Sequence, residues 1–166
     1  PFPRRQAQLL LELLSRPESP LRAVLTGPRR EGKSDLLRQI QGLLFQKAEG
    51  PLPFRYSFEP RKDAALALHF VATFCQQMRA FVMRQEEQLG EPLARIENEL
   101  ERPGLPLALT ELGREFLSLP PDEQGEFAAA LPAKFAHRDG RPLSLLFDDA
   151  ERLDSSLPIL QYLDDP

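Results

Sequence analysis

The residues best suited to chemistry form a turn at positions 27–34. Its sequence, Gly-Pro-Arg-Arg-Glu-Gly-Lys-Ser, fits the pattern G-x-x-x-x-G-K-[ST] without a mismatch. The two glycines permit backbone angles that are closed to other residues, so consecutive amide groups can curl around a phosphate. Lys33 should reach the β and γ oxygens, and the Ser34 hydroxyl is placed to ligate Mg²⁺. The turn therefore predicts a site for a nucleoside di- or triphosphate.

A second stretch, residues 142–151, ends an apolar run in carboxylates. A buried parallel strand with this sequence would deliver acid to the carboxyl edge of a sheet, where α/β proteins bind ligands. Asp148 is predicted to hold Mg²⁺ opposite Ser34, directly or through a water. Asp149 is predicted to orient or deprotonate the attacking water, and Glu151 is the second candidate for that role. Together the two stretches predict a Mg²⁺-nucleotide site.

Local patterns predict the elements that would position these stretches. A short apolar run at 23–26 is suited to a buried strand, and helical spacing follows over about 33–46. Aromatic and polar residues alternate over 54–58, which predicts a second strand. Strands alternating with crossover helices indicate an α/β fold with a parallel sheet covered by helices. Further helices are predicted over about 4–15, 64–89 with Asp63 as N-cap, 107–119 and 121–137.

The remaining segments are interpreted as structural. Residues 90–104 are polar and predict a solvated helix or a mobile insertion. Residues 122–125 match the D-x-x-G pattern of GTP-binding proteins, but prolines precede them in place of a strand, which favours the acidic first turn of a helix. Cys75 is interpreted as core filler. One cysteine and two histidines offer no plausible zinc set, so His69 and His137 are placed at helix surfaces.

Composition limits the possible partners. The 166 residues, 42% of them hydrophobic, fit one domain. A net charge of −4 and a pI near 5.3 give no global attraction to nucleic acid or anionic membrane, so nucleic-acid binding is possible but not indicated. No apolar run approaches the length of a membrane span, and no signal peptide is recognised. The lone cysteine favours a reducing, cytoplasmic setting.

These motifs resemble the AAA+-related P-loop ATPases of the STAND group, and most of all archaeal and bacterial ATPases with a Gly-Pro-Arg-Arg-x-Gly-Lys-[Ser/Thr] loop. The resemblance rests on Phe-Pro-Arg-Arg at 2–5, on the turn at 26–34 and on Leu-Leu-Phe-Asp-Asp-Ala-Glu at 145–151. It covers residues 1–59 and 142–163. It does not cover 90–141, which the resemblance implies to be a helical insertion.

The resemblance implies an ASCE-like P-loop NTPase domain over residues 1–166, with ATP or ADP and Mg²⁺ as cofactors. It places Mg²⁺ at Ser34 and Asp148 and the attacking water at Asp149. Members of the family act as ATP-driven switches that self-associate or bind protein partners, here through regions outside this chain. The implied nucleotide contacts are Phe2 and Arg5 near the adenine and Gly27, Pro28, Arg29, Arg30, Glu31, Gly32, Lys33, Ser34 and Asp35 at the phosphates.

The family also has a further strand with a polar sensor residue and a helical lid, and nothing in these residues supplies either. We therefore expect an incomplete sheet and a chain that is a fragment of a larger protein. Three alternatives stay open: a nucleotide-binding scaffold without significant hydrolysis, a DNA-associated AAA+ ATPase, and a small-molecule kinase using the same loop. The absence of an Asn-Lys-x-Asp base-reading motif favours adenine over guanine.

Overall fold

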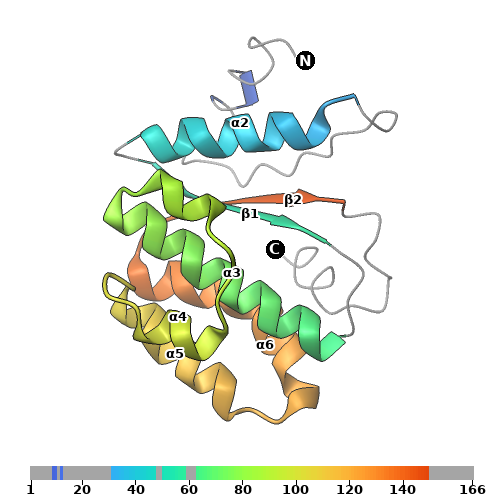
Figure 1. The fold of residues 1–166 in the computed structure, drawn as a ribbon, viewed down its shortest axis with the longest axis vertical. Coiled ribbons are helices and arrows are strands. Elements are labelled where there is room, and N and C mark those ends of the chain that lie inside the picture. Colours follow the sequence, from blue (N-terminus) through green and yellow to red (C-terminus); the bar gives the residue numbers. More distant parts are fainter. Residues whose placement is uncertain (1–8, 11, 13–30, 48–49, 59–62, 150–166) are drawn as a thin grey trace.

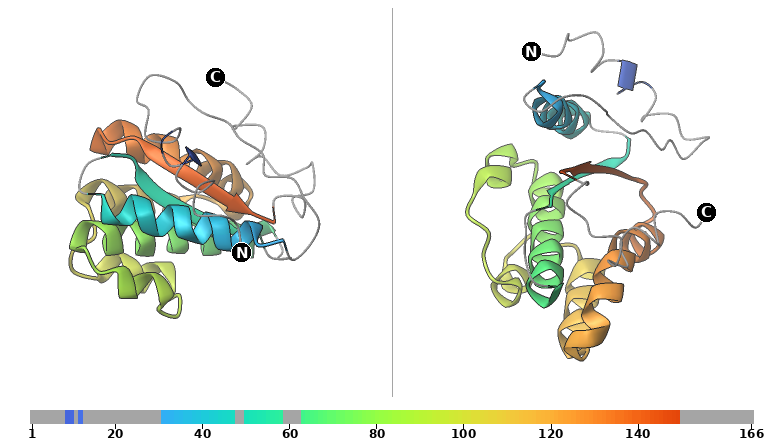
Figure 2. Two further views of the ribbon diagram at one scale, coloured as in Figure 1. Left: turned by 90° about the horizontal axis from the view of Figure 1, so that it is seen from above. Right: turned by 90° about the vertical axis from the view of Figure 1, so that its right-hand side faces the viewer.

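A computed structural model describes residues 9–10, 12, 31–47, 50–58 and 63–149 of the chain. The elements in chain order are α2 (Lys33–Gln46), β1 (Leu52–Ser57), α3 (Asp63–Met83), the 3₁₀ helix η1 (Glu86–Gly90), α4 (Ile96–Glu101), α5 (Leu107–Ser118), α6 (Pro121–Asp139) and β2 (Leu143–Asp148). The two strands form a parallel sheet between α2 on one side and the other helices on the opposite side (Figures 1 and 2). The predicted α/β class with a parallel sheet is confirmed.

The register of the sheet determines which side chains share a face. β1 and β2 pair from Leu52 opposite Leu143 to Ser57 opposite Asp148. Because successive side chains of a strand point to opposite faces, alternate residues face the two helical layers. Phe54 packs in the core beside α3 and α6, whereas Leu146 packs with α2. The Asp148 side chain, two residues after Leu146, therefore lies on the face covered by α2.

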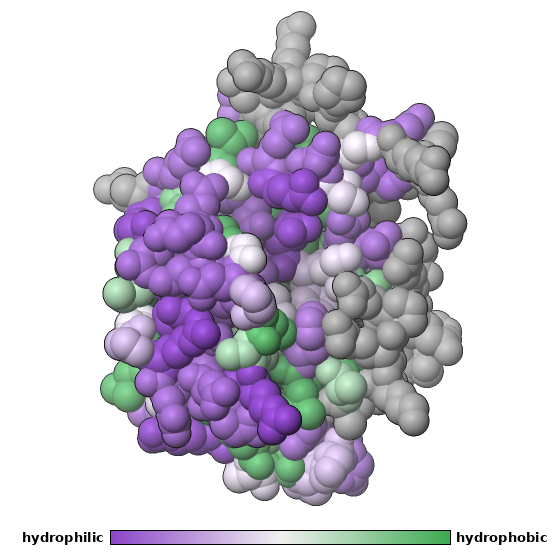
Figure 3. Space-filling model, viewed as in Figure 1, coloured by the Kyte–Doolittle hydropathy of each residue, from purple (hydrophilic) through white to green (hydrophobic). Residues whose placement is uncertain are grey.

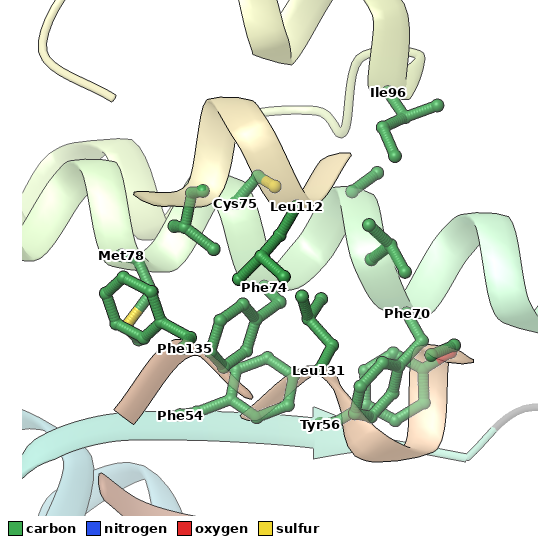
Figure 4. Packing of buried hydrophobic residues seen from close by; sticks show 14 of the residues in the cluster. Phe54, Tyr56, Phe70, Phe74, Cys75, Met78, Ile96, Leu112, Leu131 and Phe135 are labelled. Atoms are coloured by element: carbon green, nitrogen blue, oxygen red, sulfur yellow. The ribbon is translucent and has the colours of Figure 1, made fainter. Parts of the chain in front are cut away.

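The main core lies between the sheet and α3 and is built around phenylalanines (Figure 4). The Phe54 ring of β1 lies 4.8 Å from that of Phe74 and 5.2 Å from that of Phe70, both on α3. Phe74 also contacts Phe135 of α6, with ring centroids 5.6 Å apart. Fully burying one such side chain is worth about 1.5–3 kcal/mol, so these rings anchor α3 and α6 to β1.

Cys75 belongs to this core and is 0% exposed, which confirms its interpretation as core filler. Burial, reinforced by the negative charge of Glu99, raises the pKa of the Cys75 thiol to about 12. The thiol therefore stays protonated at neutral pH, and a protonated thiol is a poor nucleophile.

His69 departs from its predicted place at a helix surface. Its ring is half-buried, and Nδ1 lies 2.9 Å from the Tyr56 hydroxyl.

Helix α2 has the predicted bounds and buries its apolar stripe in a smaller cluster. Leu36, Leu37, Ile40 and Leu44 recur at helical spacing and pack with Leu146 of β2. Gly32, with φ 86° and ψ 20°, precedes the helix in the left-handed conformation that glycine adopts without strain. The helix that follows the phosphate-binding pattern is therefore fixed onto the sheet by its own apolar spacing.

The outer edge of β1 is closed by a side chain of α3. Gln77 Nε2 donates to the Arg55 carbonyl at 2.7 Å, and Gln77 Oε1 accepts from the Arg55 N–H at 3.0 Å. Pro53, on the same edge, has no N–H to offer. These features make β1 an edge strand that resists further pairing. The side of β2 that faces away from β1 has no strand neighbour among the described residues. The strand predicted at 23–26 lies outside the described residues.

Helix α3 begins at Asp63 and ends at Met83, earlier than the predicted end near 89. Arg84 interrupts it with a φ of 55°, and the chain continues into η1. Arg84 Nη1 donates to the Phe45 carbonyl at 2.9 Å and to the Lys47 carbonyl at 3.3 Å. Both acceptors lie at the end of α2. The end of α3 therefore coincides with a hydrogen bond to a distant helix, which the helical periodicity of the sequence cannot predict.

The prediction of a solvated or mobile segment at 90–104 is wrong for α4. Ile96 and Leu100 are buried in the main core, and Glu99 is 0% exposed. Glu99 lies between two arginines, with Oε2 3.6 Å from Arg79 Nε and Oε1 3.4 Å from Arg102 Nη1. The polar composition was misleading because this glutamate is buried as part of an ion-pair cluster rather than solvated.

Helices α5 and α6 confirm the predicted helices 107–119 and 121–137 to within two residues at each end. The 122–125 segment is the first part of α6: Pro121 occupies an N-terminal position, and Asp122 and Glu123 lie in the first turn. Acidic residues there interact favourably with the helix dipole, which confirms the structural interpretation. Gly140, with φ 75°, ends the helix in the left-handed conformation typical of such ends.

Candidate functional site

The first half of the candidate site is the N-terminus of α2. Gly32 accepts the first helical hydrogen bond from the Leu36 N–H at 2.9 Å, and Lys33 and Ser34 form the first turn. No side chain of the described residues caps this end. Ser34 and the neighbouring Asp35 are exposed. Amide groups at a helix N-terminus point outward and carry partial positive charge, so this end is suited to an anion.

The second half is the carboxyl end of β2. Asp148 is only 9% exposed, and its Oδ1 accepts the Asp149 N–H at 3.1 Å. Asp149 ends the strand in the left-handed conformation, with φ 54°. The Ser57 hydroxyl, from the end of β1, donates to Asp149 Oδ2 at 3.4 Å. The end of β1 thus contributes one hydroxyl, and the end of β2 contributes two carboxylates, to the same edge of the sheet.

The two halves lie at the same end of the molecule. In Figure 1 the N-terminal end of α2 and the carboxyl ends of β1 and β2 are on the right, and the view from above in Figure 2 agrees. The side chain of Asp148 is on the sheet face that α2 covers. A helix N-terminus beside the carboxyl ends of parallel strands is a place where α/β proteins commonly bind ligands.

A polar network lies beneath α2, next to the carboxylates. Arg55 Nε donates to Gln41 Oε1 of α2 at 3.1 Å, and Gln41 Nε2 donates to Gln77 Oε1 of α3 at 2.8 Å. Burial lowers the pKa of the Arg55 guanidinium, the charge of Arg38 lowers it further, and the charge of Asp148 acts in the opposite direction. Arg55 is therefore a partly desolvated cation within electrostatic range of Asp148.

Seven of the residues predicted for the site lie in the described part of the chain. The N-terminus of α2 carries five of them, and the end of β2 carries Asp148 and Asp149. Asp35 pairs with Arg38 at 3.0 Å on the outer surface of α2. The predicted residues outside the described part are Phe2, Arg5, Gly27, Pro28, Arg29, Arg30 and Glu151.

Sequence reasoning did not identify Arg55, Ser57, Gln41 or Gln77 as parts of the site. The alternation over 54–58 was a usable signal, because it places Arg55 and Ser57 together on one face of β1. The identity of that face depends on the pairing with β2, which is not visible in the sequence. The two glutamines lie on helices far apart in the chain, and no local pattern relates them.

The donor set fits Mg²⁺ in its chemistry. Carboxylate and hydroxyl oxygens are the hard ligands that Mg²⁺ prefers, and in nucleotide sites the metal uses one or two carboxylates together with phosphate oxygens. Within the described residues, no group of three or more histidine, cysteine or acidic side chains could hold a metal ion. The Ser34 hydroxyl and the Asp148 carboxylate could therefore supply part of a coordination shell, which phosphate oxygens would complete.

Comparisons with protein-family models, with curated proteins and with solved structures found no match to this chain.

None of the helices in the described part is both long and apolar enough to cross a bilayer. The face drawn in Figure 3 is mostly hydrophilic over the described residues, with small separate apolar areas.

Proposed function

We propose that this chain is a P-loop NTPase domain that binds Mg-ATP and hydrolyses ATP slowly as a conformational or assembly switch. The proposal rests on one observation. The helix that follows the phosphate-binding pattern begins at the same edge of the sheet where β2 delivers Asp148 and Asp149. A Lys-Ser pair at a helix N-terminus and an acidic strand end are the two parts that such a site requires.

Each described residue has a defined role in this proposal. The amide groups at the start of α2 and the Lys33 ammonium hold the phosphates, which they suit by charge and direction. Ser34 and Asp148 hold Mg²⁺, which when bound neutralises phosphate charge. Asp149 orients the attacking water and accepts its proton. The half-buried Asp149 carboxylate is restrained by Ser57, so it can act from one fixed position.

The finer fold belongs to the same proposal. An ASCE-like sheet would continue beyond the side of β2 that has no strand neighbour among the described residues, with the segment at 23–26 as one of its strands. The helices from 90 to 141 would be the addition to that core. They contribute Leu109, Phe116 and Phe135 to the main hydrophobic cluster, so they are integral to the stability of the domain.

A nucleotide-binding scaffold without significant hydrolysis is the second candidate. The Ser57 hydroxyl favours it, because it already donates a hydrogen bond to Asp149 Oδ2 and so competes with an attacking water for that oxygen. Self-association or protein partners would then provide the output through nucleotide binding alone. Phosphate release by the wild-type chain separates the two candidates.

Replacement of Lys33 by Ala tests nucleotide binding. Ligand that binds only the folded state stabilises it, by about 2.7 kcal/mol at a hundredfold excess over Kd. We expect Mg-ADP or Mg-ATP to raise the melting temperature of the wild type and to leave that of Lys33→Ala unchanged. Alanine favours helix at this position, so the variant should keep its fold.

Lys47→Ala is the matched control, because it removes the same charge from the other end of α2, about 20 Å away. This variant should keep the full nucleotide response. An undiminished response in Lys33→Ala, or a wild type that neither nucleotide stabilises, would disprove the proposal.

A further inference from the structure

Arg55 is held by a closed set of hydrogen bonds from three elements. Gln77 of α3 binds both backbone groups of Arg55, Gln41 of α2 is bonded to Gln77, and Gln41 Oε1 accepts from Arg55 Nε. Both glutamines are buried. A side chain restrained in this way has little freedom to turn away, so the position of its charge is fixed by the fold.

The position of Arg55 argues against contact with phosphate. Its partner Gln41 lies about two turns into α2, roughly 12 Å along the helix axis from Lys33. On the strand side, Ser57 is level with Asp148, and Arg55 lies about 6–7 Å behind Ser57. The guanidinium is therefore behind Asp148 as seen from the start of α2, on the inner side of the candidate site.

Arg55 interacts with Asp148 through its charge rather than through contact. The carboxylate acts on the guanidinium electrostatically. No ion pair or hydrogen bond joins the two side chains among the described residues, and Asp148 Oδ1 accepts instead from the Asp149 N–H. Arg38, a cation of α2 that acts on Arg55, is 64% exposed and is paired with Asp35, so solvent and its partner screen it. Arg55, which is partly buried on the inner side of the candidate site, is screened less than Arg38.

We propose that Arg55 is a positioning residue that acts through Asp148 and makes metal binding depend on the nucleotide. A fixed positive charge behind two carboxylates lowers their affinity for a divalent cation. The site therefore binds a metal ion only weakly when no nucleotide is bound. A polyphosphate brings negative charge and further oxygen ligands, and the metal then enters with it. This inference rests on the proposed function, because it assumes that the phosphates bind at the start of α2.

Mn²⁺ provides the probe, because it substitutes for Mg²⁺ in oxygen sites and its free form is counted by electron paramagnetic resonance. We expect the wild-type chain without nucleotide to bind Mn²⁺ weakly. Arg55→Gln should bind it about tenfold more tightly, as expected for a unit charge acting on a divalent ion at a largely solvated distance. Arg55→Lys keeps the charge and should stay within about threefold of the wild type on the same scale.

Two controls separate this charge effect from other causes. Arg38→Gln removes an exposed, paired charge from α2 and should change Mn²⁺ affinity by less than about twofold. ADP affinity measured in EDTA should fall by no more than about threefold in Arg55→Gln, because Arg55 does not contact phosphate and only its screened field reaches it. Thermal unfolding checks the fold of each variant, and Arg55→Met replaces Arg55→Gln if glutamine disturbs it.

Several outcomes would overturn the inference. Tight Mn²⁺ binding by the wild type without nucleotide would overturn the inference by itself, before any variant is measured. Unchanged or weaker Mn²⁺ binding in Arg55→Gln also overturns the inference. A loss of ADP affinity in EDTA of about a hundredfold would show instead that Arg55 is a phosphate ligand. If ADP fails to bind the wild type, the proposed function is disproved. The Mn²⁺ affinities of the wild type and Arg55→Gln would still show whether the charge of Arg55 weakens metal binding at Asp148.

Discussion

Asp149 combines an unusual backbone conformation with a candidate catalytic role. Its φ of 54° is disfavoured for most residues by about 1 kcal/mol, and asparagine and aspartate tolerate it best. Residues in such conformations are often found at functional sites, where the surrounding structure enforces them. Here Asp149 directly follows β2 and its carboxylate accepts from the Ser57 hydroxyl, at the edge that α2 also reaches.

Asp149→Asn should therefore keep the left-handed backbone conformation and nucleotide binding but lose turnover. The amide fits the left-handed conformation, so the free energy of unfolding should change by less than about 0.5 kcal/mol. It cannot accept a proton from water, so phosphate release should fall by about a hundredfold or more. Asp122→Asn, at the exposed start of α6, is the matched control and should retain full activity. Undiminished hydrolysis in Asp149→Asn would assign the role to Glu151 or to another residue.

The helices opposite α2 are packed closely enough that single methyl groups matter. Gly113 of α5 faces Leu100 of α4, and a Cβ at position 113 would lie 2.3 Å from Leu100 Cδ2 and 3.0 Å from Cδ1. Both methyl groups and the branch point would have to move together, in a side chain that is itself 9% exposed. The small residue is therefore what allows α4 to lie against α5.

Gly113→Ala should destabilise the protein by about 1–3 kcal/mol, the usual effect of adding a methyl group to a filled core. Gly125→Ala is the matched control, because Gly125 lies within α6 and a Cβ there would meet nothing within 4 Å. That variant should gain about 0.5–1 kcal/mol from alanine's better helix propensity. Urea unfolding measures both changes, and equal effects at the two positions would contradict the close contact.

At the scale of the whole molecule, hydrophobic burial is unequal on the two sides of the sheet. The large cluster joins β1 to α3, α4, α5 and α6 and takes only Phe45 from the end of α2, whereas the cluster under the rest of α2 contains four leucines and one isoleucine as its buried members. Less buried apolar area holds α2, so its local opening should cost less free energy than global unfolding. The proposed ligand-binding helix is thus the part of the described fold that a ligand can most readily stabilise.

Hydrogen exchange followed by mass spectrometry tests this distribution. Without nucleotide, amides in the middle of α2 should be protected at least about tenfold less than those of α3 over 70–78. Mg-ADP should slow exchange in α2 and leave α3 nearly unchanged. Equal protection of the two helices would show that they open as one cooperative unit, and protection gained only in α3 would move the ligand to the other side of the sheet.

The sequence alone determined the local elements of this protein. The bounds of α2, α5 and α6 follow from apolar spacing and from glycine and proline at their ends, all of which act within a few residues. The strand ending at Asp148 was also predictable, because an apolar run and its acidic end are contiguous. These features need no knowledge of distant parts of the chain.

Only the tertiary structure decided which distant residues meet. The pairing of β1 with β2 sets Ser57 level with Asp148 and places Arg55 behind it, and buried glutamines from two helices fix that arginine. The burial of Glu99 between two arginines likewise reversed what its polar surroundings indicated. Such contacts depend on how whole elements pack, and a local pattern carries no information about the partner an element will find.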